Sequence, residues 1–156
     1  FFFYLPSKTY AVKILLNSIK QKTIIFGNSI KSLNDITPDA VISSHNSDEI
    51  NDDIRNDFEY NKIQTISSFK KLKQGANLSS LDVCIIKDYY SSEVDFIQRI
   101  GRLRMDGDKI GHVFIFVTKN TQETVWFNKM IQNCNNYNYI LCGSIMRAVE
   151  EYKKYI

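Results

Sequence analysis

The sequence predicts an α/β fold in which helices cover both faces of a mostly parallel central sheet. Short apolar runs rich in β-branched residues alternate with segments of helical periodicity along most of the 156 residues. Such alternation produces βαβ units, and these place parallel strands in one buried sheet. Polar residues follow each of the first four apolar runs, so the strand ends are expected to form one connected surface.

A local sequence pattern predicts each strand and helix. Five strands are expected from the apolar runs, over residues 22–26, 40–44, 62–66, 82–86 and 112–117. Helices are expected over residues 8–20, 28–35, 47–58, around Arg99, from 121 to a break near 135, and over 140–155. Ser7 can cap the first helix, and Ser47 with two acidic residues after it suits the start of the third.

Length and composition limit the classes of protein. A chain of this length predicts one main domain, here assigned to residues 1–134, with a helical extension over 135–156. No apolar run approaches the roughly 20 residues that cross a bilayer, so no membrane partner is expected. The first residue is Phe rather than Met, which favours a piece of a longer protein.

The net charge and the cysteines limit the possible partners, metal sites and cellular location. The formal net charge of +3 permits contact with nucleic acid. The 3 cysteines are odd in number and lack CxxC spacing, so neither a disulfide framework nor a zinc site is supported, and no metal ligands are predicted. A cytoplasmic location follows, which would be the host cytoplasm for a viral protein.

The arginines are unevenly distributed. Of the five in the chain, three lie at Arg99, Arg102 and Arg104. Guanidinium groups bind phosphate and carboxylate in pairs of hydrogen bonds, so the cluster suggests oxyanion recognition. On a helix, Gln98, Arg99 and Arg102 fall within about 100° of one another, whereas Arg104 lies about 160° from Arg102. Charge alone also fits a solvated basic helix face.

The order of residues in 98–104, Gln-Arg-Ile-Gly-Arg-Leu-Arg, resembles the last signature of superfamily 2 (DExx-box) helicases and translocases, QRxGRxxR. The resemblance implies the second of two RecA-like domains, a three-layer α/β/α fold with C-terminal helices here. It also implies that Gln98, Arg99, Arg102 and Arg104 reach toward ATP bound by the first domain. The family places its last arginine one position later, at Met105, so Arg104 can replace it only if the helix ends by about Leu103.

Three further segments are similar to this family. Residues 23–29 resemble the strand and turn that meet the nucleic-acid backbone, which implies contacts from Asn28 and Ser29. Residues 67–78 resemble the motif TxxxxxGxD. The further positions implied are Ser67, Ser68 and His45 for nucleic acid, and Gly75 and Asn77 for the nucleotide. Residues 121–127 resemble the segment after the final strand in helicases of phage type.

Two motifs of a complete motor are missing. No GxxxxGK[ST] loop and no DExx box occurs in the chain, so ATP with Mg²⁺ is expected to be held mainly by a separate N-terminal RecA-like domain. The chain alone is therefore expected to be inactive as an ATPase. The expected partners are that domain and nucleic acid, with DNA favoured over RNA. The alternative is a non-catalytic α/β module, derived from such a domain, that binds nucleic acid or protein.

Overall fold

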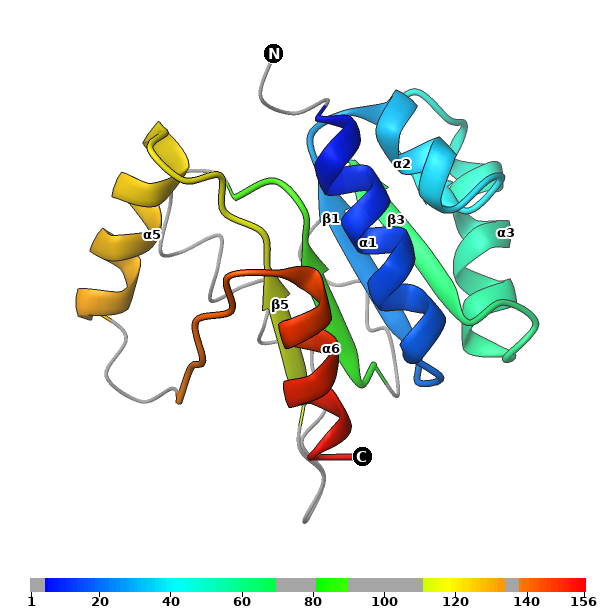
Figure 1. Ribbon diagram of the computed structural model, residues 1–156. Helices are drawn as coiled ribbons and strands as arrows, with labels where there is room; N and C mark the ends of the chain where they lie inside the picture. The colour runs from blue at the N-terminus through cyan, green and yellow to red at the C-terminus, as the bar shows by residue number, and fades with distance from the viewer. Residues whose placement is uncertain (1–4, 70–80, 90–110, 134–137) are drawn as a thin grey trace.

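The computed structural model describes residues 5–69, 81–89, 111–133 and 138–156. Helices and strands alternate along these residues (Figure 1). The elements are α1 (Pro6–Ser18), β1 (Thr23–Gly27), α2 (Ile30–Ile36), β2 (Val41–Ile42), α3 (Asp48–Glu59), β3 (Thr65–Phe69), β4 (Val83–Ile86), β5 (His112–Ile115), α5 (Gln122–Asn133) and α6 (Ile145–Lys153).

The five strands form one sheet in the order β2-β3-β1-β4-β5, and every neighbouring pair is parallel. The predicted α/β fold with a parallel sheet is therefore confirmed. The strands are level with one another: Phe26 pairs with both Ser68 and Ile86, and Ile86 pairs with Ile115. All the carboxyl ends consequently lie at one edge, here called the carboxyl edge, and all the amino ends at the opposite amino edge.

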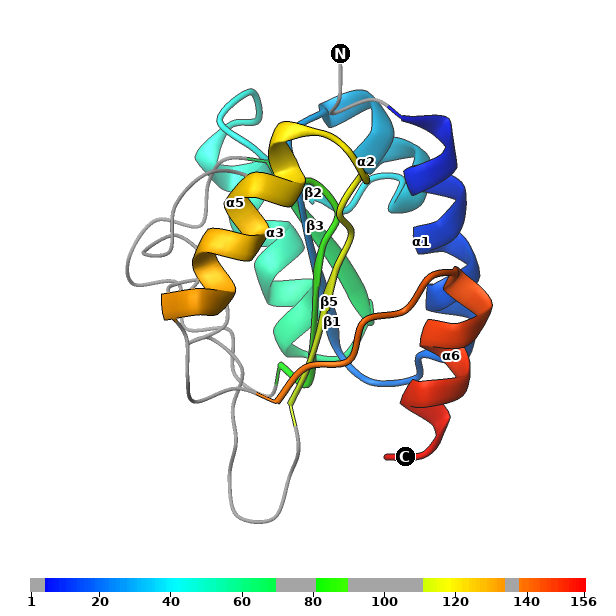
Figure 2. The same ribbon diagram turned by 60° about the vertical axis from the view of Figure 1, so that its left-hand side comes forward.

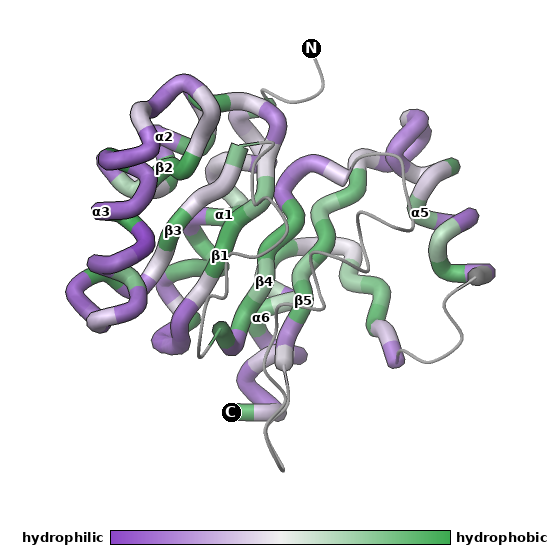
Figure 3. Tube along the Cα trace, turned by 180° about the vertical axis from the view of Figure 1, so that it is seen from behind, coloured by the Kyte–Doolittle hydropathy of each residue, from purple (hydrophilic) through white to green (hydrophobic). Residues whose placement is uncertain are grey.

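Helices cover both faces of the sheet, which gives three layers (Figure 2). One apolar cluster joins alternate strand residues such as Ile24 and Cys84 to α3 and α5. The second joins the intervening residues, such as Ile25 and Ile85, to α1, α2 and α6. Figure 3 shows the consequence in the colours, since β1, β4 and β5 are largely hydrophobic whereas α3 is largely hydrophilic. Central strands buried on both faces need such continuous apolar runs.

The helix starts test the capping predictions. Ser29 caps α2 by accepting from the Ser32 N–H at 3.3 Å, and Ser47 caps α3 by accepting from the Ile50 N–H at 3.3 Å. The predicted cap of α3 is confirmed, and α2 begins at Ile30, close to the start expected at residue 28. The prediction for Ser7 was wrong, because α1 begins at Pro6, whose fixed φ suits the first helical position and whose missing N–H costs nothing there.

The third strand differs from its prediction. It was expected over residues 62–66, with Ser67 and Ser68 beyond its end, but β3 runs from Thr65 to Phe69 and includes both serines. Their side chains are buried, with 0% and 1% exposure. Ser67 can be buried because its hydroxyl accepts a hydrogen bond from the Thr37 hydroxyl at 2.6 Å. A polar pair therefore lies inside a strand where an exposed turn was predicted.

Candidate functional site

The carboxyl edge carries the predicted nucleic-acid residues of the first turn. Asn28 and Ser29 directly follow β1, the central strand of the sheet. Both residues are half-buried. The Ser29 oxygen is used to cap α2, and its hydroxyl proton has no acceptor among the described residues. This proton can therefore be donated to a ligand oxygen such as a phosphate.

A buried carboxylate holds the turn that follows β1. Asp88, which follows β4, accepts a hydrogen bond from the backbone N–H of Asn28 at 2.9 Å. The side chain of Asp88 has 0% exposure. The lack of a side chain at Gly27 eases this approach: a Cβ at this position would lie 3.2 Å from the Asp88 carboxylate and 2.9 Å from the end of the Leu33 side chain. A larger residue would make these two side chains shift where the strand ends meet.

A lysine next in sequence pairs with that carboxylate. The Lys87 ammonium donates to both Asp88 oxygens at 3.1 and 3.2 Å, and its side chain also has 0% exposure. Burial raises the pKa of Asp88 above its ordinary value, opposed by the hydrogen bond from Asn28 and by the charge of Lys87. Burial likewise lowers the pKa of Lys87, opposed by the charge of Asp88. Each charge thus offsets part of the desolvation cost of the other.

A second carboxylate, that of Glu123, holds a backbone amide beyond the neighbouring strand β5. Glu123, in the first turn of α5, accepts from the Thr118 N–H at 2.7 Å, just beyond β5. Its other oxygen accepts from the Lys8 ammonium at 2.5 Å. Lys8 comes from the first turns of α1 and is only 7% exposed. The Lys8 ammonium also lies 3.9 Å from the Asp88 carboxylate, so it stands between the two acids.

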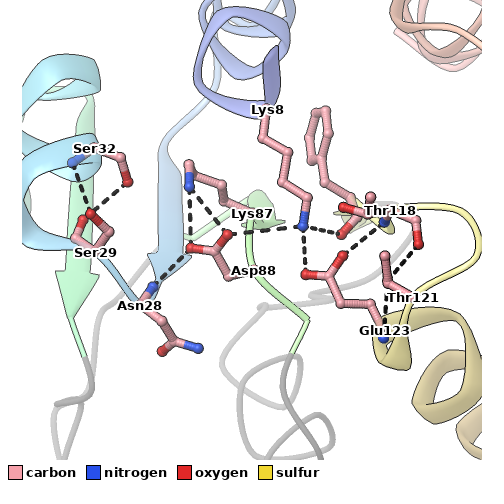
Figure 4. A network of polar contacts seen from close by, with 10 residues as sticks. Lys8, Asn28, Ser29, Ser32, Lys87, Asp88, Thr118, Thr121 and Glu123 are labelled. Carbon is pink, nitrogen blue, oxygen red and sulfur yellow. Dashed lines mark hydrogen bonds and ion pairs between the residues drawn. The ribbon is translucent and has the colours of Figure 1, made fainter. Parts of the chain in front are cut away.

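Together these four side chains form what is here called the charged network: Lys8, Lys87, Asp88 and Glu123 (Figure 4). Two positive and two negative charges leave it neutral, which is what burial demands. Its two carboxylates each fix a backbone amide beyond a strand end. The arrangement is thus a rigid support beneath the carboxyl edge.

Sequence reasoning missed the charged network. Asp88 was recognised only as part of a polar strand end, and Lys87, Lys8 and Glu123 were not singled out. The one usable signal was the Lys87-Asp88 pair directly after a fully apolar strand, since adjacent opposite charges there suggest burial. Lys8 and Glu123 gave no signal, because nothing local shows which distant group a helical side chain will meet.

His45 lies beyond the second strand. Its side chain is exposed, its N–H donates to the Ser43 hydroxyl at 3.2 Å, and its ring stands edge-on to Phe69 with 6.0 Å between centroids. His45 is thereby placed near the end of β3, within the carboxyl edge. Its contact with a nucleic-acid backbone stays a prediction.

Ser67 and Ser68 were predicted to contact nucleic acid as well. The Ser67 hydroxyl is used inside the fold, by the bond from Thr37. The Ser68 hydroxyl has no hydrogen-bond partner among the described residues. Both are covered, so within the described structure they do not line the surface that Asn28, Ser29 and His45 share.

The remaining predicted site residues lie outside the described residues: Gly75, Asn77, Gln98, Arg99, Arg102 and Arg104. Their roles stay predictions, as does the boundary between residues 134 and 135. Within the described part of the chain, no group of three His, Cys, Asp or Glu side chains could hold a metal ion. No helix in that part is long and apolar enough to cross a membrane.

Comparison with known protein families identifies the class of protein to which this fold belongs. Residues 7–107 match the helicase conserved C-terminal domain. That match spans more than half of the chain, so the protein belongs to this family, and its domain is a C-terminal RecA-like domain of a superfamily 2 helicase.

Solved structures agree with this fold. The C-terminal domain of a variant Dbp5 from S. cerevisiae, bound to a Gle1 variant and IP6, is 16% identical with a TM-score of 0.78, over 95% of this chain and 90% of that one. S. cerevisiae Dbp5 bound to RNA and ADP BeF3 is 15% identical with a TM-score of 0.78, over 94% of this chain and 41% of that one.

A third structure is more distant. Mycobacterium smegmatis helicase Lhr, bound to ssDNA and AMP-PNP, is 15% identical with a TM-score of 0.63, over 80% of this chain and 18% of that chain. This chain thus spans less than half of the Dbp5 chain in the RNA-bound structure and less than a fifth of the Lhr chain. No curated protein sequence matches it.

Proposed function

We propose that this chain is the second motor domain of an ATP-dependent helicase or translocase. The observation that carries the proposal is the family match over residues 7–107, which includes the Gln98–Arg104 signature and the turn after β1. ATP bound on a first domain closes the two domains, and arginines of the second stabilise the charge of the transferred phosphoryl group. Arg102 is the principal candidate, with Gln98, Arg99 and Arg104 beside it in sequence.

The first domain supplies the rest of the nucleotide site. Among the described residues, both acids of the charged network are already engaged by lysines and backbone amides, so neither is arranged as a magnesium ligand. Mg²⁺ and the phosphates would be held by the P-loop and DExx box of that domain, and Gly75 and Asn77 would approach the nucleotide. Bound ATP and Mg²⁺ supply the phosphoryl-transfer chemistry that drives the motor.

The carboxyl edge is the proposed nucleic-acid interface. Asn28, Ser29 and His45 offer an amide, a hydroxyl proton and an exposed imidazole at one edge of the sheet, which suits contacts to phosphates and sugars rather than to bases. Binding is therefore expected to weaken with salt and to be indifferent to sequence. The RNA in the Dbp5 structure gives no support to DNA over RNA, and both should be tested.

The decisive experiment is steady-state ATPase by the intact motor. Arg102→Ala should lower kcat by roughly 10³-fold, the scale seen when an arginine finger is removed. The matched control is Arg147→Ala, because Arg147 lies on the exposed side of α6 in a surface pair with Glu151, and it should leave turnover unchanged. Near-normal ATPase in Arg102→Ala would reject the proposed role. If the wild-type motor bound nucleic acid but never hydrolysed ATP, the chain would be a binding module instead.

A further inference from the structure

Burying the charged network costs desolvation free energy that a fold stabilised by apolar packing alone would avoid. Four ionisable side chains are buried at one place, with exposures of 7% or less. Replacing a buried ion pair by apolar side chains of similar volume is often neutral or stabilising, so packing alone does not explain these residues. A function that depends on the hydrogen bonds of these four side chains explains their burial better.

The hydrogen bonds of the network point outward to loops. Asp88 accepts from the Asn28 N–H, and Glu123 accepts from the Thr118 N–H, and each donor lies beyond the end of a strand. A carboxylate that accepts from a backbone amide fixes that peptide plane strongly, because the acceptor is charged. The fixed peptide unit joins Gly27 to Asn28, and Ser29 is the next residue in the turn.

We propose that Asp88 is a positioning residue of the nucleic-acid interface: it holds the turn that carries Asn28 and Ser29 through the Asn28 amide, and the lysines hold its carboxylate in place. This inference rests on the proposed function, because it assigns a task to a residue that does not itself touch nucleic acid. Without the bond, the turn would have to be ordered by the ligand, at a cost in affinity.

Gly27, at the end of β1, is a second observation that supports the positioning role of Asp88. The residue lacks a Cβ where one would press on Leu33 at 2.9 Å and approach the Asp88 carboxylate at 3.2 Å. The absence of a side chain at Gly27 thus leaves the Asp88 carboxylate room beside the turn, at the oxygen that accepts from Asn28. The close approach is a property of two separate strand ends, β1 and β4, and not of one loop.

The test compares two double variants that differ only in the hydrogen-bond acceptor. Lys87→Met with Asp88→Asn removes both charges and keeps an oxygen for the Asn28 N–H. Lys87→Met with Asp88→Leu removes the charges and the acceptor, with a side chain of nearly the same shape. Neither variant leaves a buried charge unpaired, so both should fold. The control is Asp82→Asn, which removes a carboxylate at the amino edge beside the same strand.

Two measurements are made on each variant. Hydrogen exchange of the Asn28 amide, followed by NMR in the 156-residue chain without nucleic acid, reports on the turn itself. Fluorescence anisotropy with labelled 20-nucleotide poly(U) RNA and poly(dT) DNA reports on binding by the intact motor. The Leu variant should exchange this amide at least about tenfold faster than the Asn variant and bind about tenfold more weakly. The Asn variant and Asp82→Asn should bind within about twofold of wild type.

The outcomes separate the two proposals. Equal exchange of the Asn28 amide in the two double variants would overturn the positioning role, and so would faster exchange in the Leu variant with equal binding. In both cases the wild-type motor still binds nucleic acid, and the proposed function stands. A wild-type motor that binds neither RNA nor DNA would instead reject the proposed interface, and with it the task assigned to Asp88.

Discussion

The two edges of the sheet are closed in different ways. At the carboxyl edge, Lys8, Lys87, Asp88 and Glu123 are buried together and hold backbone amides beyond β1 and β5. At the amino edge, no charged side chain of the described residues is buried, although Lys22 donates to the Glu59 carbonyl at 3.3 Å and the charge of Asp82 acts on His112. The Tyr152 hydroxyl donates to the side chain of Gln21, and the His112 ring packs edge-on against Tyr152 with 4.9 Å between centroids.

The amino edge is packed without a buried charge among the described residues. The amino edge achieves it with aromatic packing and hydrogen bonds between uncharged groups, including those from Thr23 and Gln64 to the Gln21 carbonyl at 2.9 and 3.1 Å. Buried charges cost desolvation free energy that such contacts avoid. Among the described residues, buried charges occur only at the carboxyl edge, which supports the proposal that this edge is shaped for a ligand.

The largest expected effect breaks the charged network. Glu123→Ala leaves the Lys8 ammonium buried without its nearest acceptor, so the free energy of unfolding should fall by about 3–5 kcal/mol. Urea denaturation of the 156-residue chain measures this. Glu150→Ala, on the exposed side of α6, should change the free energy by less than about 0.5 kcal/mol. A loss below about 1 kcal/mol in Glu123→Ala would show that the two edges do not differ as described.

A smaller effect separates two adjacent hydroxyls of β3. Ser67→Ala removes a buried acceptor and leaves the Thr37 hydroxyl with only the Leu33 carbonyl, at a cost of about 1 kcal/mol. Ser68→Ala removes a buried hydroxyl that has no partner among the described residues, so it should be neutral or slightly stabilising. Unfolding free energies of the two variants give the comparison. Equal losses would contradict this difference and would mean that the Ser68 hydroxyl also has a hydrogen-bond partner inside the folded chain.

The smallest effect concerns pH at the amino edge. Burial lowers the pKa of His112 below its ordinary value of 6.5, against the opposing charge of Asp82. The unfolded chain therefore binds the proton first, and stability is present above pH 6.5 and is lost as the pH falls from there toward the folded pKa. The rings of Tyr152 and Tyr155 pack near the His112 ring, and burial raises the pKa of Tyr152 further above this range.

Comparison with His112→Phe isolates this contribution. The variant keeps an aromatic ring against Tyr152 and cannot titrate, so other acid-sensitive groups cancel in the difference. Urea midpoints of both proteins at about pH 7.5 and about pH 5.5 should show wild type losing more stability than the variant on acidification. A difference that stayed constant with pH would contradict the burial of His112.

The fold could be predicted because its strands are buried on both faces. A run such as 82–86 is apolar throughout, and β4 occupies Val83–Ile86 of it. Polar residues inside β3 could not be predicted in the same way. The burial of Ser67 depends on Thr37, which lies 30 residues earlier, and no local pattern contains that contact.

The site could be predicted only where a turn follows a strand directly. Asn28 and Ser29 were expected at a strand end because they follow an apolar run, and the structure places them at the carboxyl edge, while their contact with nucleic acid stays a prediction. The role of Asp88 toward Asn28 could not be found, because the bond joins residues 60 positions apart. Motif resemblance identified Arg102 and its neighbours, and their placement stays a prediction.

The contact between Lys8 and Glu123 has a consequence for how the protein is made. The two residues are separated by 115 positions, so Lys8 leaves the ribosome long before its partner exists. At about 5–20 residues per second, the interval is about 6–23 seconds. During that time α1 carries an ammonium group that an apolar sheet cannot cover without cost. The N-terminal helix can therefore dock fully only late in synthesis, and a chaperone that recognises exposed apolar helix faces would have this interval in which to act.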